Sequence, residues 1–297
     1  MATNSYSNLK NSATTWNKAI RKFGIVTVMN AKVYDVYDGM TMTEYAKYIT
    51  GQSGSLSQAQ LGVLQKINSS FVTGTGSNLE LVGTAVIDFS VLKTNEIISL
   101  YLLTKEVARL KYLKTANATE DGPNKTITGG KNNAPLVKYG KTARLEMQDA
   151  LGNAEALEAL TGVTVEYFRT TVVTDGNYAN EQATDVLHVT DGFAGHHTII
   201  GDTFIVSDSG KEIPAYVIYY DFLSDSLLNL TQEADGDATV FDMNGDLIRT
   251  DILVGDYEAT GDTDGVVVGD FYTILPKLAY ETNPQVIEAA SQSNVGN

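Results

Sequence analysis

The sequence predicts a mainly β protein, a β-sandwich or barrel-like fold with one or two flanking α-helices and a partly helical N-terminal insertion. Short runs rich in β-branched and aromatic residues recur along the chain, and Asp-Gly and Asn-Gly turn dipeptides separate them. The composition, 43% hydrophobic and 19% charged, is typical of folded globular proteins. A chain of 297 residues can bury a sizeable core, and we treat 1–297 as a single domain.

The first third of the chain mixes both kinds of element. Residues 1–22 predict an irregular or weakly helical N-terminal arm. Residues 22–39 are rich in Val, Ile and Tyr and end in Asp-Gly, which indicates a strand followed by a turn. Residues 40–80 predict the partly helical insertion, with one short helix ending at Gly51 and a second capped by Ser57.

The middle of the chain predicts strands, a loop and one helix. Residues 78–103 hold two apolar segments separated by a polar turn, which favours two strands over one long helix. Residues 114–135 are polar and rich in Gly and Pro, which indicates a loop, and the residues after them alternate like a strand. Residues 153–162 predict a helix that buries Leu157 and Leu160 and ends at Gly162.

Beyond Gly162 the pattern is β almost throughout. Residues 196–222 predict two strands joined by a turn at Ser-Gly-Lys. Asn244-Gly245 stands between two further strand patterns, and this dipeptide is the strongest hairpin signal among short motifs. We expect the C-terminal tail, 282–297, to be loose at its end.

The charges are distributed unevenly along the chain. Residues 1–150 carry 17 Lys and Arg against 11 Asp and Glu, a net charge of +6, whereas 151–297 carry 4 against 25, a net charge of −21. Opposite ends could meet in head-to-tail assembly, or the acidic half could face something to which it must not adhere. A solvated acidic surface that maintains solubility is the alternative. Because the acidic half would repel phosphates, a general nucleic-acid binder is disfavoured.

The compartment follows from two absences in the sequence. There is no cysteine, so neither a disulfide framework nor a thiolate metal site is possible. The N-terminus has no apolar core of a secretory signal, and no apolar run approaches the length of a membrane span. We therefore expect a soluble protein that is synthesised in the cytoplasm and has no membrane partner.

The Gly-Lys-Thr at 140–142 invites a comparison with a phosphate-binding loop. That loop also needs a glycine five residues earlier, so that backbone N–H groups can curl around the phosphates. Pro135 occupies this position and has no N–H to donate. The residues before Gly140 alternate like a strand, so we interpret Gly-Lys-Thr as the start of the next strand.

Other chemical motifs are incomplete. His196 and His197 are adjacent and would point to opposite faces of a strand, so only one of them could join His188 at a zinc site. Asp242, Asn244 and Asp246 approach the spacing of a calcium loop, but Leu247 replaces its glycine and the final glutamate is missing. No G-x-S-x-G elbow occurs. We expect no catalytic, cofactor-binding or metal-binding residues, no cofactor, and no enzyme activity.

Two stretches have distinctive motifs. The first is 128–162, with a Gly-Gly/basic/Asn loop, then Tyr-Gly-Lys, Asp-Ala-Leu and a helix ending in Leu-x-Gly. The second combines 201–222 with 229–249, which contains Glu-Ala-Asp-Gly-Asp and Phe-Asp. In these motifs the chain resembles the major tail tube proteins of tailed bacteriophages, in particular those related to phages of Gram-positive hosts. Asn132 and Ala238 depart from the family pattern, and the 40–80 insertion matches no part of it. The first match falls on Gly129, Gly130, Lys131, Asn133, Leu136, Tyr139, Gly140, Lys141, Asp149, Ala150, Leu151, Leu160 and Gly162.

The resemblance implies a virion structural protein with a tail tube fold. Such subunits form hexameric rings whose strands join into a continuous barrel, and the rings stack into the conduit for DNA ejection. The implied partners are further copies of the chain and other tail proteins: sheath if the tail is contractile, tape measure, baseplate and terminator. DNA would pass without specific binding, through an acidic lumen. The implied assembly loop is Gly129, Gly130, Lys131 and Asn133, and the candidate lumen acids are Glu166, Asp185 and Asp246.

Two other classes of protein stay open at this point. One is a different virion structural protein, such as a capsid, tail terminator or baseplate protein. The other is a calcium- or carbohydrate-binding adhesion module, which the Asp-Gly turns would suit and which would be a stable monomer.

Overall fold

The computed structural model describes most of the chain between residues 24 and 277. The described residues are 24–25, 28, 30–51, 53–111, 113–122, 125–129, 134–149, 154–169, 183–189, 192–206, 212–225, 241–254 and 266–277. The predicted N-terminal arm, 1–22, and the predicted tail, 282–297, lie outside them.

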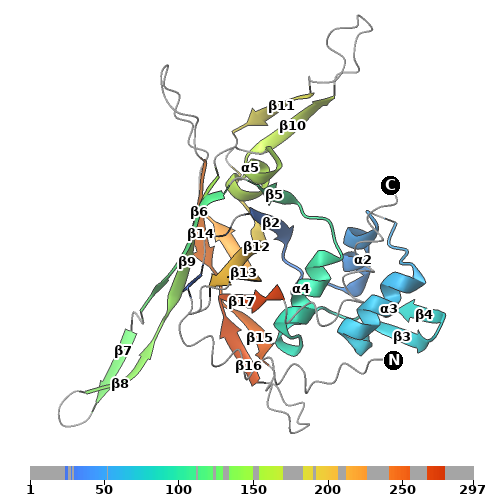
Figure 1. Ribbon diagram of the computed structural model, residues 1–297, viewed down its shortest axis with the longest axis horizontal. Helices are drawn as coiled ribbons and strands as arrows, with labels where there is room; N and C mark the ends of the chain where they lie inside the picture. The colour runs from blue at the N-terminus through green and yellow to red at the C-terminus, as the bar shows by residue number, and fades with distance from the viewer. Residues whose placement is uncertain are drawn as a thin grey trace, which may run out of the picture.

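The protein is mainly β, as the sequence predicts, and its centre is a nine-stranded antiparallel sheet within the described residues (Figure 1). Seven strands follow one another in the order β5-β2-β12-β13-β14-β9-β6, while β1 pairs with β12 and β17 with β13. The strands are β1 (Gly24–Ile25), β2 (Asn30–Asp35), β5 (Ala108–Leu110), β6 (Leu113–Asp121), β9 (Thr142–Asp149), β12 (His196–Val206), β13 (Glu212–Ser224), β14 (Phe241–Leu247) and β17 (Tyr272–Pro276).

Four two-stranded hairpins accompany this sheet in the described part of the chain. Two of them, β7–β8 and β10–β11, extend away from the body of the molecule in opposite directions (Figure 1). The pairs are β3 (Val72–Thr75) with β4 (Asn78–Leu81), β7 (Lys125–Gly129) with β8 (Ala134–Tyr139), β10 (Thr164–Arg169) with β11 (Ala183–His188), and β15 (Thr250–Val254) with β16 (Val266–Asp270).

Helices α2 (Met42–Thr50) and α3 (Gln58–Ile67) confirm that the 40–80 segment is partly helical. Thr41 and Ser57 begin them with capping boxes, in which each side chain accepts from a backbone N–H three residues on. Gly51 ends α2 with a φ of 63°, a left-handed conformation that glycine adopts without strain. Short 3₁₀ turns, η2 (Ser69–Phe71) and η3 (Phe89–Val91), lie further along the chain.

The predicted helix near residue 154 is confirmed as α5 (Ala154–Thr161). Leu157 and Leu160 are buried, as expected. Gly162 follows the helix with a φ of 70°, and a Cβ there would lie 2.7 Å from the carbonyl O of Gly192. Glycine is therefore needed at this position both for its conformation and for the close approach of the next loop.

The prediction of two strands over 78–103 holds only for β4 at its start, because η3 follows β4 and the second half forms helix α4 (Thr94–Leu102). Five consecutive residues of α4, Ile97 to Tyr101, are buried on every side. A helix that is apolar all round shows no amphipathic stripe, so periodicity does not separate it from a buried strand. Its start has a local cause, since the Glu96 carboxylate accepts a hydrogen bond of 2.8 Å from the Lys93 N–H.

The predicted loop at 114–135 is also wrong, because β6 and β7 occupy most of it. β6 pairs with β9 from Leu113 to Asp121. Small and polar residues are compatible with this strand because it lies at the edge of the sheet and much of it faces solvent. The backbone ladder to β9 therefore orders a segment with little apolar surface.

Asn244-Gly245 does not form the predicted hairpin but lies inside strand β14. There, Gly245 pairs with Ser224 of β13 and with Leu145 of β9. A Cβ on Gly245 would lie 2.2 Å from the carbonyl O of Leu223. The glycine is thus required by the close approach of a neighbouring strand, and tertiary packing overrides the local turn preference.

Two hydrophobic clusters lie on opposite faces of the central strands. Alternate residues of one strand serve each cluster: Tyr34 and Ile200 face one, Val33 and Ile199 the other. The first cluster packs the sheet against α2, α3 and α4, which gather on one side of the molecule (Figure 1). The second joins the sheet to α5 and continues onto the inner faces of β9 and β14.

The first cluster contains several buried tyrosines, which makes stability sensitive to alkaline pH. Burial raises the pKa of Tyr220 to about 12 and raises the pKa of Tyr37 and Tyr101 as well. Unfolded tyrosines ionise near pH 10, so below that pH both states keep the proton. Above it the unfolded state deprotonates first, and the free energy of unfolding should fall by about 1.4 kcal/mol per pH unit for each tyrosine.

This predicts a urea midpoint that is steady up to about pH 10 and falls steeply towards pH 12. Tyrosinate absorbance should rise together with unfolding. Tyr220→Phe should make the decline shallower, and a midpoint that does not change up to about pH 12 would contradict the buried tyrosine cluster.

Candidate assembly interface

A long β-hairpin dominates one side of the molecule. β6 and β9 form its base within the sheet, and β7 and β8 continue it beyond the sheet (Figure 1). Gly140 has a φ of 87°, and Thr142 is the first residue of β9. The Gly-Lys-Thr therefore stands at a bend where β8 passes into β9, and it begins a strand as expected.

The predicted assembly loop falls at the tip of this hairpin. Gly129 is the last residue of β7, and β8 begins at Ala134. Gly130, Lys131 and Asn133 lie outside the described residues, between the two strand ends. β7 and β8 pair with each other and with no other described strand, and they project from the body of the molecule (Figure 1).

The base of the hairpin also forms an edge of the sheet. Among the described strands, β6 pairs only with β9, so its second edge has no backbone partner there. A nine-residue edge strand presents a row of N–H and C=O groups to which another chain can add. The edge is not apolar, which limits indiscriminate aggregation and favours a specific partner.

The projecting hairpins β7–β8 and β10–β11 each have two strands in the described residues. An isolated two-stranded hairpin is at best marginally stable in water, because it buries little apolar surface. Such hairpins gain stability when another protein surface packs against them.

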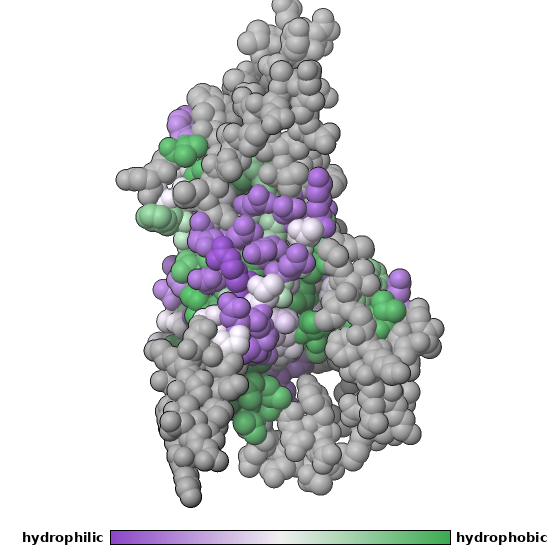
Figure 2. Space-filling model, turned by 90° about the vertical axis from the view of Figure 1, so that its left-hand side faces the viewer, coloured by the Kyte–Doolittle hydropathy of each residue, from purple (hydrophilic) through white to green (hydrophobic). Residues whose placement is uncertain are grey.

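The outward face of β9 and β14 is strongly charged. Arg144 is its centre: Nη1 donates to Asp225 Oδ2 at 2.7 Å, and Nη2 donates to Asp225 Oδ1 at 3.0 Å. Nη1 also donates to Asp246 Oδ1 at 3.3 Å, and Nε lies 4.0 Å from Glu146 Oε1. Three carboxylates thus surround one guanidinium, which leaves a local excess of negative charge. Figure 2 shows hydrophilic side chains gathered across the middle of this face.

The structure separates the three candidate lumen acids. Asp246 lies in β14 on the charged face, and its side chain is 72% exposed. Glu166 lies in the β10–β11 hairpin, where its Oε2 is 3.0 Å from His188 Nε2. Asp185 pairs through its backbone with Tyr167 in the same hairpin, and its side chain lies outside what the structure describes. The candidates therefore belong to two different surfaces.

The residues of the incomplete metal motifs contact other side chains and backbone groups. Asp242 and Asp246 lie on one face of β14, where Gln148 Nε2 donates to Asp242 Oδ1 at 2.8 Å. Within the described residues, no group of three or more His, Asp or Glu side chains is placed to hold a metal ion. The histidines have different neighbours: His188 contacts Glu166, His196 Nδ1 lies 2.8 Å from Asp221 Oδ1, and His197 Nε2 lies 2.8 Å from the carbonyl O of Ala159.

An exposed apolar group beside the β10–β11 hairpin was not predicted. Phe193 is 89% exposed and Val189 is 69% exposed. The backbone of this loop packs against Gly162 at the end of α5, which fixes its position. The signal in the sequence was an aromatic residue within a Gly-rich turn, Asp-Gly-Phe-Ala-Gly.

Comparison with models of protein families found no match to the chain, and comparison with curated proteins found none either. Among the described helices, none is long and apolar enough to cross a membrane.

Proposed function

We propose that this chain is a virion structural protein, the major tail tube subunit of a tailed bacteriophage. Copies would assemble into stacked, hexameric rings that form the conduit for DNA ejection. The observation that carries the proposal is the long hairpin, because the loop that resembles the tail tube family connects its two projecting strands, β7 and β8. A projecting tip is where a contact between rings is expected.

The strand edges favour assembly by β-sheet extension. The edge of β6 that has no partner among the described strands is nine residues long and offers main-chain groups to a neighbouring copy. Closing sheet edges between subunits yields a barrel without exposed edges, which removes the risk of uncontrolled pairing. The two projecting hairpins, each two-stranded within the described residues, would gain stabilising contacts in the same assembly.

The acidic face of β9 and β14 suits the wall of a DNA conduit. Its excess carboxylates act on DNA through a field that extends about one Debye length, ~8 Å at physiological salt. Phosphates are repelled over that distance, so a duplex would slide without adhering. The net charge of −21 over residues 151–297 favours the same interpretation.

Lysine substitution of candidate lumen acids tests this function. In Asp246→Lys and Glu166→Lys particles, each new phosphate contact should hold DNA and release counterions. We expect normal assembly with DNA retained at low salt, and binding that weakens about threefold per contact when salt rises fourfold. The measurement is DNA retention by purified particles across a salt series.

The matched control is Glu80→Lys, at an exposed acid of β4 on the helical side of the molecule. This variant should eject DNA normally. If particles with lysine at lumen positions also ejected DNA normally at low salt, the acidic residues of 151–297 would serve only to keep the protein soluble.

A further inference from the structure

A polar pocket lies on the sheet face that carries α4, apart from the projecting hairpins. Its volume is about 300 Å³, and β2, β5, β12 and β13 supply most of its wall. Lys32 of β2 lies directly opposite Arg109 of β5, and Asp202 of β12 lies directly opposite Tyr216 of β13. Lys111 and Lys277 complete the polar wall.

The wall of this pocket is cationic in a protein whose net charge is −15. Among the described residues, it contains four basic side chains and a single carboxylate, that of Asp202. Lys277 satisfies that carboxylate: its Nζ donates to Asp202 Oδ1 at 2.6 Å and lies 4.3 Å from the centre of the Tyr216 ring. The other three cations have no acid in the pocket wall to balance them.

Those three cations are only partly neutralised from outside the pocket. Arg109 Nε lies 3.3 Å from Glu106 Oε1, but it is buried and makes no hydrogen bond. Lys32 and Lys111 form no ion pair within the described part of the chain. The Arg109 side chain as a whole is 40% exposed, so the guanidinium N–H groups other than the buried Nε are the ones that can donate to an oxyanion in the pocket.

We propose that this pocket binds a small polyanion that carries phosphate or several carboxylates. The Arg109 guanidinium offers several N–H donors in a fixed plane, which match the oxygens of such a group. Lys32 and Lys111 add point charges beside it. A pocket of about 300 Å³ lies at the lower end of the range for small-molecule sites, so it suits a compact ligand and not a nucleic-acid strand. The site is independent of the proposed function.

Calorimetric titration of the full-length chain with pyrophosphate, and separately with citrate, tests the proposal at low salt. Wild type should bind one equivalent of at least one of these anions. Lys32→Met and Arg109→Met should each weaken binding about tenfold or more, because each removes a charged hydrogen-bond donor. Lys114→Met, at an exposed lysine of β6 outside the pocket, should bind like wild type.

A second measurement separates loss of the site from loss of the fold. Urea midpoints of the variants should match wild type without ligand, and ligand should raise the midpoint of wild type and Lys114→Met far more than that of the pocket variants. The proposal is overturned if neither anion binds at millimolar concentration, or if the pocket variants bind as well as Lys114→Met. Failure of the pocket variants to assemble, without any anion binding to wild type, would make this surface a subunit contact instead.

Discussion

Replacing both Gly129 and Gly130 with phenylalanine is expected to leave a folded subunit that cannot build tubes. Gly129 ends β7 at the projecting tip, far along the hairpin from the sheet (Figure 1). Among the described strands β7 pairs only with β8, outside the central sheet, so the free energy of unfolding should change little. A bulky side chain at a close subunit contact should cost about 2 kcal/mol or more per contact and raise the critical concentration at least ~30-fold.

The measurement is sedimentation velocity, with electron microscopy after seeding. The control is Gly122→Phe, in the same hairpin between β6 and β7, where a Cβ would meet nothing within 4 Å. The control should assemble like wild type. Normal tubes from the double variant would show that the tip is a solvated turn with no part in assembly.

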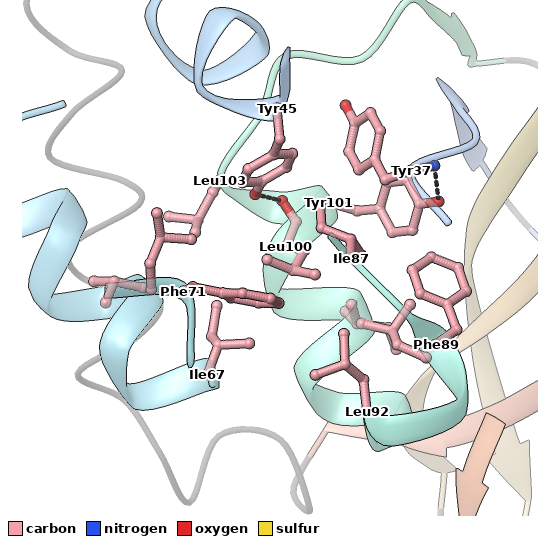
Figure 3. Close-up of a cluster of buried hydrophobic side chains, with 14 of the residues drawn as sticks. Tyr37, Tyr45, Ile67, Phe71, Ile87, Phe89, Leu92, Leu100, Tyr101 and Leu103 are labelled. Carbon is pink, nitrogen blue, oxygen red and sulfur yellow. Dashed lines mark hydrogen bonds between the residues drawn. The ribbon is translucent and has the colours of Figure 1, made fainter. Parts of the chain in front are cut away.

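Tyr101→Ala should cause one of the largest losses of stability, about 3–5 kcal/mol. Tyr101 is fully buried in the helical cluster, stacked on Tyr37 with ring centres 4.6 Å apart and edge-on to Phe89 (Figure 3). Its hydroxyl accepts from the Tyr37 N–H at 3.2 Å and lies 2.7 Å from Thr198 Oγ1. Since Thr198 donates to the Tyr220 carbonyl, the Tyr101 hydroxyl donates to Thr198. The side chain therefore ties α4 to strand β12.

Tyr101→Phe separates the hydrogen bonds from the packing. It keeps the ring but removes the acceptor of the Tyr37 N–H and one of the two hydrogen bonds of the Thr198 hydroxyl, which should cost about 1–3 kcal/mol. Tyr48→Phe, at a side chain that is 37% exposed, is the control and should cost less. Urea denaturation followed by circular dichroism measures all three. A Tyr101→Ala loss below about 1 kcal/mol would contradict the packing of the helices on the sheet.

The elements that the sequence predicted well have local signals. Thr41 and Ser57 cap their helices through neighbouring side chains, and Gly51 and Gly162 end helices in left-handed conformations. These causes act within a few residues, so they can be read without the fold. Helix α4 was not predicted, because its residues are buried on all sides and show no helical periodicity. Its only local signal is Glu96, and the N-cap position before the helix is occupied by Lys93, which is not a capping residue.

Other features depend on contacts between distant segments. Gly245 suggested a turn, but it serves the approach of β13 to β14. The edge strand β6 is ordered by β9, more than twenty residues later. The residues that line the cationic pocket are spread along the sequence from 30 to 277, so no local sequence motif predicted the pocket. For the candidate assembly loop, the resemblance supplied the residues, and the structure shows that they connect β7 with β8, where Gly129 pairs with Ala134.

Electron microscopy of the purified protein, in negative stain and with sedimentation of the same sample, tests the assembly proposal most directly. The proposed function predicts rings or tubes with a central hole, built from this chain alone or after seeding. A monodisperse monomer at high concentration that also fails to polymerise on seeding would contradict it.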